Sequence, residues 1–240
     1  MEKEEFRKYI EKECKENNII NLQEFEIDKL YTYMKEILKW NEKVNLTAIK
    51  EEKEFIVKHF IDSLTIAEYI KNGENVIDIG TGAGFPGIPL KIIRNKSKIV
   101  LVDAVNKKLN VIRDILPKIK IEDVKCIHSR AEDLAQSKEY REAFDCVVSR
   151  AVSNLTTLVE YMLPFAKIGG KVICMKGPNF EEELKESLKA INILGGKIEK
   201  KVTLKIDNVL ERNLIIINKE NPTPKQYPRG QGKPLKNPIK

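Results

Sequence analysis

Three alternate glycines between a short apolar run and a helix-like segment constrain the fold of this chain most. Residues 76–79 are apolar except for Asp78, and Gly80, Gly82 and Gly84 follow directly. A glycine adopts positive φ at low cost in a tight turn and lets a ligand approach the backbone closely. The pattern predicts a parallel strand, a cofactor-binding loop and a helix, in that order.

Two cofactor classes fit such a loop. The frame Gly82, Gly84 and Gly87 satisfies the GxGxxG pattern of NAD-dependent oxidoreductases. However, Asp78 lies two residues before Gly80, and a carboxylate there would repel a pyrophosphate. The same charge suits the ammonium and sulfonium groups of S-adenosylmethionine (SAM). We therefore expect Asp78, Gly80 and Gly82 to bind SAM, with NAD as the alternative.

A second apolar run, residues 99–102, ends in Asp103, which is placed to accept hydrogen bonds from both hydroxyls of a ribose. Further strand-like runs alternate with amphipathic segments, and polar residues 207–212 separate the last two runs. This order predicts an α/β, doubly wound, Rossmann-like sheet of seven mostly parallel strands with a C-terminal antiparallel hairpin. Such a hairpin is typical of the class I SAM-dependent methyltransferase fold and is absent from a plain dinucleotide-binding domain. The expected strands are 75–79, 98–102, 123–128, 144–148, 171–175, 201–206 and 213–218.

Periodicity and charge divide the chain into three parts. Residues 1–72 are predicted to form an N-terminal helical cap, because apolar residues recur at helical spacing, as from Phe25 onward. Residues 73–220 are predicted to form the SAM-binding domain, and residues 221–240 a basic tail. The net charge of +7 is distributed over these parts as −3, +5 and +5.

The tail has five basic residues and no acidic one, and five prolines and two glycines interrupt it. This composition favours an extended strap over a helix. Its cations suit RNA phosphates, while the alternative is a solvated, disordered end that only aids solubility. The candidate RNA-binding residues are Lys225, Arg229, Lys233 and Lys236.

The start of the chain is charged and lacks the apolar core of a signal peptide, and no apolar run approaches the length of a membrane span. The four cysteines form no CxxC pair, and three of them fall in or beside strand-like runs. We therefore expect a cytoplasmic monomer with free thiols, without a metal site and without membrane contact.

Longer segments resemble a known family. Segments 78–90 (DIGTGAGFPGIPL) and 102–108 (VDAVNKK) are similar to the first two motifs of class I methyltransferases. Other segments extend the similarity from about Trp40 to the C-terminus: WNEKVNLTAI (40–49), KHFIDSL (58–64), SRAEDL (129–134), FDCVVSRAV (144–152), CMKG (174–177) and TPKQYPRGQGKPLKNPI (223–239). Together they resemble the bacterial 16S rRNA guanine-N7 methyltransferase family RsmG, also named glucose-inhibited division protein B.

The resemblance implies SAM as the cofactor, 16S rRNA or the small ribosomal subunit as the partner, and N7 of guanine 527 in the 530 loop as the methyl acceptor. Guanine N7 carries an in-plane lone pair and no proton, so direct SN2 transfer needs no general base. No residue is therefore assigned as catalytic with certainty. An NAD-dependent oxidoreductase, a SAM- or RNA-binding module without activity, and a small-molecule methyltransferase are the alternatives.

Residues directly after each strand are further candidates, because ligands of such sheets bind at the carboxyl ends of the strands. Gly80 would face the methionine part of SAM through its backbone. Phe85 either walls the cofactor pocket or packs beneath the helix. The resemblance places Ala131 and Glu132 near the adenine, although Glu132 could equally be an acid at a helix N-terminus.

Two cations also follow expected strands. Arg150 is a candidate for holding the methionine carboxylate or steering a phosphate, and a surface ion pair is its alternative role. Lys176, after the fifth expected strand, is a candidate contact to a substrate phosphate or base.

Two polar groups in the cap complete the candidates. His59 and Asp62 share a helical face and could contact the cleft, and the alternative is that His59 is a structural histidine with its hydrogen bonds satisfied. Trp40, Asn41 and Thr47 belong to a polar connector that the resemblance places beside the cofactor cleft, with a capped turn as the alternative.

Overall fold

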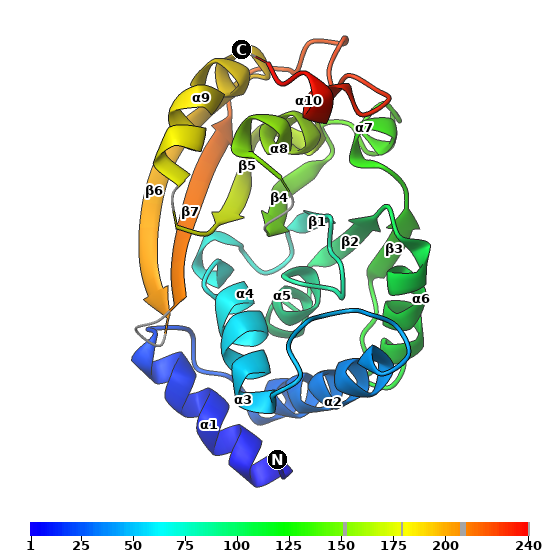
Figure 1. Ribbon diagram of the computed structural model, residues 1–240, viewed down its shortest axis with the longest axis vertical. Coiled ribbons are helices and arrows are strands. Elements are labelled where there is room, and N and C mark those ends of the chain that lie inside the picture. Colours follow the sequence, from blue (N-terminus) through cyan, green and yellow to red (C-terminus); the bar gives the residue numbers. More distant parts are fainter. Residues whose placement is uncertain (151–152, 179, 207–209, 240) are drawn as a thin grey trace.

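A seven-stranded sheet forms the centre of the molecule (Figure 1). The computed structural model describes residues 1–150, 153–178, 180–206 and 210–239. The strand order is β3-β2-β1-β4-β5-β7-β6, in which β1 to β5 are parallel and β7 runs antiparallel to both β5 and β6. The predicted mostly parallel sheet with an antiparallel C-terminal hairpin is confirmed. The strands are β1 (Asn75–Ile79), β2 (Lys98–Asp103), β3 (Val124–His128), β4 (Phe144–Arg150), β5 (Ala166–Lys176), β6 (Gly196–Ile206) and β7 (Leu210–Lys219).

Helices cover both faces of the sheet (Figure 1). The face that carries α5 and α6 also receives the helices before residue 73, and the opposite face carries α7, α8 and α9. The helices are α1 (Lys3–Glu16), α2 (Glu24–Asn41), α3 (Glu52–Phe55), a π-helical segment (Ile56–Ile61), α4 (Asp62–Leu64), a 3-10 turn (Ala67–Tyr69), α5 (Gly87–Ile93), α6 (Asn106–Ile115), α7 (Ala131–Leu134), α8 (Leu155–Met162), a 3-10 turn (Leu163–Phe165), α9 (Phe180–Ile193) and α10 (Lys233–Lys236).

Side chains along the central strands point alternately to the two faces of the sheet, and this produces two hydrophobic cores. Val76 packs into the core on the α5 side, whereas Ile77 packs into the core on the α8 side. Side chains of successive strand residues point to opposite faces, so a strand covered on both sides is apolar almost throughout. β1 follows this rule, with only Asp78 as a charged residue among its buried positions.

The strand order reverses between β1 and β4. β1 pairs with β2 on one side and with β4 on the other, all in parallel. Ligands of open α/β sheets bind outside the carboxyl ends of the strands at such a reversal. The glycine loop after β1 lies at this position.

The elements before residue 73 form a helical layer against α5 and α6. Phe6, Leu30, Tyr33 and Phe60 are fully buried in this layer. Phe25 was expected on the buried face of α2, but its side chain is 49% exposed. The first buried apolar residue of α2 is Ile27, so the apolar face begins two residues later.

Residues 221–239 run over α7 and α8 (Figure 1). Arg141 donates hydrogen bonds to the carbonyl oxygens of Thr223 at 2.7 Å and Tyr227 at 2.8 Å. Gln136 donates to the carbonyl of Pro228 at 2.8 Å. The tail is therefore an extended segment bound to the domain, with α10 as a short helical turn.

Parts of some predicted segments cannot be compared with the structure, because residues 151–152, 207–209 and 240 lie outside the described residues. Among those described, no helix is both long and apolar enough to cross a membrane. The four cysteines are free thiols.

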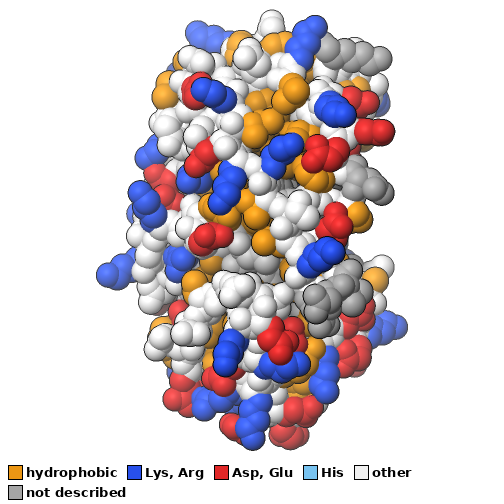
Figure 2. Space-filling view, turned by 90° about the vertical axis from the view of Figure 1, so that its left-hand side faces the viewer, with side chains coloured by type: hydrophobic (Ala, Val, Ile, Leu, Met, Phe, Trp, Pro, Cys, Tyr) orange, Lys and Arg blue, Asp and Glu red, His pale blue; other side chains and the backbone are white. Residues whose placement is uncertain are grey.

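The outer face formed by β6 and α9 carries basic and acidic side chains interspersed (Figure 2).

Candidate functional site

The glycine loop is held between the sheet and the cap. Gly80, Gly82 and Gly84 all have positive φ, of 71°, 59° and 85°. A Cβ on Gly84 would collide with the hydroxyl of Tyr33 from α2. That hydroxyl donates a hydrogen bond to the carbonyl of Ala83 at 2.6 Å. The first glycine-rich motif thus has the predicted turn, and a cap helix fixes it.

Asp78 braces the loop from beneath. Its Oδ2 accepts hydrogen bonds from the Thr81 hydroxyl at 2.7 Å and the Gly87 amide at 2.9 Å, while Oδ1 is buried without a hydrogen-bond partner. Burial raises the pKa of this carboxyl to about 6, although the bonds from Thr81 and Gly87 and the charge of Arg150 oppose the shift. The sequence placed Asp78 against the cofactor's positive groups, whereas its described contacts are with the loop.

A cavity of about 170 Å³ opens at the carboxyl ends of β1, β2 and β3. Asp103 forms part of its wall and ties two loops together: its Oδ2 accepts from the Gly82 amide and its Oδ1 from the Val105 amide, both at 2.8 Å. The cavity is lined by Ile79, Gly80, Val102, Asp103, Ala104, Ser129, Arg130, Ala131, Glu132 and Tyr161.

The opposite wall of the cavity comes from α7 and α8. Glu132 is only 3% exposed, and its Oε1 has no hydrogen-bond partner. A guanidinium nitrogen of Arg130 lies 3.6 Å from this oxygen, beyond hydrogen-bond distance. A buried acceptor without a donor is costly and suits a ligand that brings one. Carboxylates on two sides and apolar surface between them fit a nucleoside, such as the adenosine of SAM.

Phe85 lies outside this cavity. Its ring is 4% exposed and stacks on His59 with centroids 4.5 Å apart, and the ring of Tyr33 meets it edge-on at 5.8 Å. The Arg150 guanidinium carbon is 5.3 Å from its centroid. These contacts pack Phe85 against the cap, and the expected role in the wall of the cofactor pocket stays a prediction.

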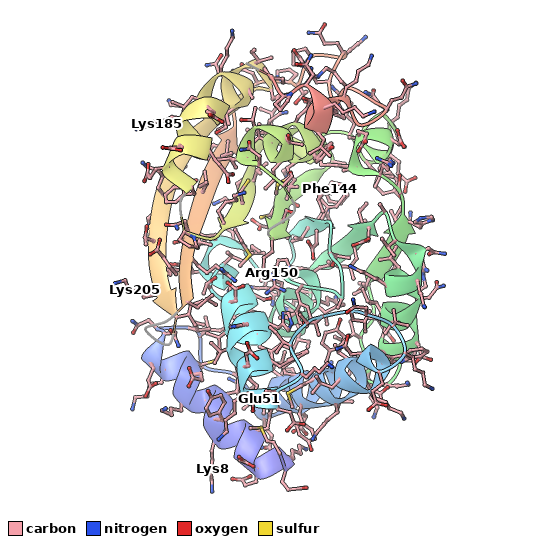
Figure 3. All side chains as sticks on the ribbon, in the orientation of Figure 1. Lys8, Glu51, Phe144, Arg150, Lys185 and Lys205 are labelled. Carbon is pink, nitrogen blue, oxygen red and sulfur yellow. The ribbon has the colours of Figure 1, made fainter. Side chains whose placement is uncertain are left out.

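Arg150 lies at the centre of the molecule beside α4 (Figure 3). It donates to the carbonyl of Lys58 at 2.9 Å, to Oδ2 of Asp62 at 3.1 Å and to Nδ1 of His59 at 3.0 Å. Arg212 of β7 binds the other oxygen of Asp62 at 2.8 Å. Burial lowers the pKa of Arg150, and Asp62 partly compensates. The ion pair of Arg150 is thus a buried one, not the surface pair considered as an alternative.

His59 is a neutral link in the same network. Because its Nδ1 accepts from Arg150, its Nε2 carries the proton and donates to the hydroxyl of Thr47 at 2.8 Å. Burial, with Arg150 and Lys58 nearby, lowers its pKa to about 3. Asn41 in turn accepts from the amide of Thr47 at 3.0 Å. The polar connector and the predicted His59–Asp62 face therefore meet at Arg150.

Lys176 is also paired. Its ammonium donates to the carbonyl of Ser153 at 2.7 Å and lies 2.8 Å from Oε2 of Glu183. The same carboxylate oxygen accepts from the Leu155 amide at the start of α8. These contacts connect the end of β5 with α8 and α9.

The four candidate tail residues divide into two kinds. Lys225, Lys233 and Lys236 are exposed. Arg229 instead forms a fork on the buried carboxylate of Glu160, with Nε to Oε1 at 2.9 Å and Nη2 to Oε2 at 2.7 Å. Its side chain is 24% exposed, and its cation is paired with Glu160.

Comparison with known families identifies the relationship. A family model described as GidB, rRNA small subunit methyltransferase G, matches residues 26–215. The chain belongs to this family. A ribosomal RNA small subunit methyltransferase G from Clostridium novyi is 53% identical over 219 residues, which cover 88% of this chain and 90% of the relative. Another from Clostridium botulinum is 45% identical over 239 residues, covering 98% and 100%.

Solved structures share the fold of this GidB-family chain. An rRNA methylase from Streptococcus thermophilus has a TM-score of 0.50 at 18% identity, covering 67% of this chain and 95% of its own. TYW2 from M. jannaschii, solved in complex with AdoMet, has a TM-score of 0.53 at 15% identity, covering 65% and 73%. The class I SAM-dependent methyltransferase fold predicted from the sequence is confirmed.

Part of the lining of the cavity in this GidB-family protein was predicted from the sequence. Gly80, Asp103, Ala131 and Glu132 were predicted for the cofactor site and line the cavity. Ala104, Ser129 and Arg130 were missed, although each adjoins a predicted residue or lies in the SRAEDL segment. Tyr161 had no signal, because it is one aromatic residue on an apolar helix whose packing against α7 only the fold reveals.

Proposed function

We propose that this protein transfers the methyl group of SAM to N7 of a guanine in 16S rRNA, in the 530 loop of the small ribosomal subunit. Membership of the GidB family supports a methyltransferase that acts on this RNA. The observation that carries the cofactor part is the cavity at the carboxyl ends of β1 to β3, with Asp103 on one side and, on the other, a Glu132 oxygen that accepts no hydrogen bond from the described residues.

Each side of the cavity has a proposed role. Asp103 would accept hydrogen bonds from the ribose hydroxyls, since each of its oxygens has a lone pair beyond the one bound by Gly82 or Val105. Glu132 and Ala131 would hold the adenine end, and Gly80 and Gly82 the methionine end. SAM, when bound, supplies a methyl group activated by its sulfonium.

Asp78, Phe85 and Arg150 would support the cofactor site from positions outside the cavity lining. Asp78 adds negative potential beneath the loop, which favours a cationic ligand. Phe85 and Arg150 fix the cap against the same loop through His59 and Tyr33. The hydrogen bonds to Lys58, Asp62 and His59 use three of the five N–H groups of Arg150, so a direct contact to the methionine carboxylate would use one of the other two.

The RNA would contact the exposed cations of the tail, Lys225, Lys233 and Lys236. The Lys176 ammonium has three N–H donors, two of which are directed to Ser153 and Glu183, so a contact to the substrate would use the third. The acceptor N7 needs no deprotonation, so the work left to the protein is alignment and exclusion of water. We further propose that the protein acts as a cytoplasmic monomer.

The deciding experiment is methyl transfer from isotopically labelled SAM to 16S rRNA and small subunits isolated from cells that lack the modification. The product nucleoside is identified by mass spectrometry. We expect labelled 7-methylguanosine, and we expect Asp103→Ala to raise the dissociation constant for SAM at least about tenfold by removing an acceptor for the ribose.

Folding of Asp103→Ala is checked by circular dichroism and thermal melting. Transfer to another atom or another RNA would overturn the proposed acceptor while leaving the cofactor in place. SAM binding without transfer to any ribosomal substrate would favour a binding module without activity. Stabilisation by NAD and not by SAM would revive the oxidoreductase alternative.

A further inference from the structure

The carboxylate of Glu160 is buried in α8 and is neutralised by a single residue from the tail. Glu160 is 0% exposed. Its Oε1 accepts from the backbone amide of Arg229 at 2.8 Å and from Nε at 2.9 Å, and its Oε2 accepts from Nη2 at 2.7 Å. Such a fork is strong and directional, and it raises the pKa of Arg229. Both the charge and the lone pairs of Glu160 thus depend on Arg229.

The helix that carries Glu160 also forms part of the cavity wall. Tyr161, the next residue of α8, lines the cavity together with Ala131 and Glu132 of α7. A buried carboxylate without its partner is strongly unfavourable, so α8 would shift or open to let water reach it. Any such movement changes the wall at Tyr161.

The tail also binds the segment that follows α7. Gln136 and Arg141 hold the carbonyls of Pro228 and Tyr227, directly before Arg229. The tail therefore joins α7 and α8 on the side away from the cavity, and none of its described residues, 221–239, lines the cavity. Its contacts set the spacing of the two helices whose other sides face the ligand.

We propose that Arg229 is a positioning residue for the SAM pocket: its fork on Glu160 fixes α8, and through the tail α7, in the arrangement that forms the far wall. This inference rests on the proposed SAM site. It assigns Arg229 to cofactor binding through the protein and not to contact with RNA.

The test is a double-mutant cycle read by SAM affinity. Titration calorimetry gives the dissociation constant for SAM of the full chain and of the variants Arg229→Gln, Glu160→Gln and Glu160→Gln/Arg229→Gln. We expect Arg229→Gln to raise the dissociation constant about tenfold, a coupling of ordinary size between a remote contact and a site. The double variant has no unpaired buried charge and should recover most of this loss.

The matched control is Arg7→Gln. Arg7 also pairs with a glutamate, at 2.5 Å, but Glu24 is 77% exposed, so its loss leaves no buried charge. SAM affinity should be unchanged. An affinity of Arg229→Gln within twofold of the native protein, or a loss that Glu160→Gln does not reduce, would overturn the inference.

Hydrogen exchange separates this inference from the proposed function. In Arg229→Gln, amides of α7 and α8 should exchange faster than in the native protein, and the double variant should restore their protection. If the native protein binds no SAM, the proposed cofactor is wrong, and the exchange of α7 and α8 still decides the positioning role. If Arg229→Gln does not fold, Arg229→Lys supplies the comparison, because it keeps the cation and loses the fork on Glu160: a dissociation constant for SAM several-fold above that of the native protein supports the role, and native affinity overturns it.

Discussion

Asp62 is a fully buried acid whose two oxygens are bound by different arginines. Arg150 binds Oδ2 and Arg212 binds Oδ1, so one carboxylate joins the cap to β4 and to β7. Removal of one partner of a buried pair leaves an uncompensated charge and is more harmful than loss of the whole pair. The position of Arg150 is therefore set by this cluster as much as by the strand that carries it.

The neutral state of His59 predicts a pH dependence of stability. Its pKa is about 3 in the folded protein against an ordinary value of 6.5, so the unfolded chain binds the additional proton as the pH falls below 6.5. Between pH 7 and pH 5 this lowers the free energy of unfolding by about 2 kcal/mol. His59→Gln keeps an acceptor for Arg150 and a donor for Thr47 but does not titrate.

The measurement is urea unfolding of the native protein and His59→Gln at pH 7 and pH 5. Asp78 acts in the opposite direction, because its folded pKa of about 6 exceeds the ordinary 3.8 and the folded protein takes up a proton as the pH falls through 6. Both proteins retain Asp78, so the variant should gain stability relative to the native protein on acidification. Equal changes in both proteins would contradict a buried neutral His59.

Residues of the pocket were predictable where the backbone alone defines their role. Asp103 ends β2, Ala131 and Glu132 begin the helix that follows β3, and all three line the cavity. Arg150 and Lys176 likewise end β4 and β5, but their partners lie 92 and 23 residues away in the chain, at Lys58 and Ser153. A sequence pattern predicts at which edge of the sheet a side chain lies. It does not predict which group, distant in the sequence, that side chain binds.

At the scale of elements, α2 and the glycine loop act as one unit. Tyr33→Phe removes the hydrogen bond to the Ala83 carbonyl and leaves that buried acceptor unsatisfied. We expect a loss of about 1–3 kcal/mol in the free energy of unfolding and weaker SAM binding. Thermal melting and titration calorimetry check both effects.

Tyr31→Phe is the control on the same helix. Its hydroxyl lies 3.4 Å from the Met1 carbonyl, a long contact in a half-buried position. It should change stability and SAM affinity little. A Tyr33→Phe protein that matches Tyr31→Phe in both measurements would show that the cap does not control the loop.

The order and type of the strands were predictable, and some of their lengths were not. β5 begins at Ala166 and β6 at Gly196, each five residues before the expected start. The additional residues of β5 include Gly169 and Gly170, and glycine is a poor strand former. The additional residues of β6 include charged side chains, and β6 lies at the edge of the sheet. In both, pairing with a neighbouring strand outweighs the local preference.

At the scale of the whole molecule, the net charge predicts salt-sensitive RNA binding. The tail cations Lys225, Lys233 and Lys236 are exposed. Replacing all three with alanine should reduce the slope of log affinity against log salt by about 0.7 for each RNA phosphate that is no longer neutralised. Filter binding of 16S rRNA at several salt concentrations measures this slope.

The control carries three exposed lysines of α9 and β6, Lys185, Lys189 and Lys205, changed to alanine. Its net charge equals that of the tail variant, so a general charge effect would lower both slopes equally. A smaller slope in the tail variant alone places the RNA on the side of α7 and α8. SAM affinity should be retained by both, because Arg229 is intact.

The fork between Glu160 and Arg229 also has a consequence for synthesis of the protein. Glu160 precedes its partner by 69 residues in the chain. A nascent chain therefore carries this acid without its cation while α9, β6 and β7 are being made. With Arg229 in its proposed positioning role, the pocket wall would settle only after Arg229 has left the exit tunnel, and a product released early would hold its methyl donor poorly even with a complete sheet.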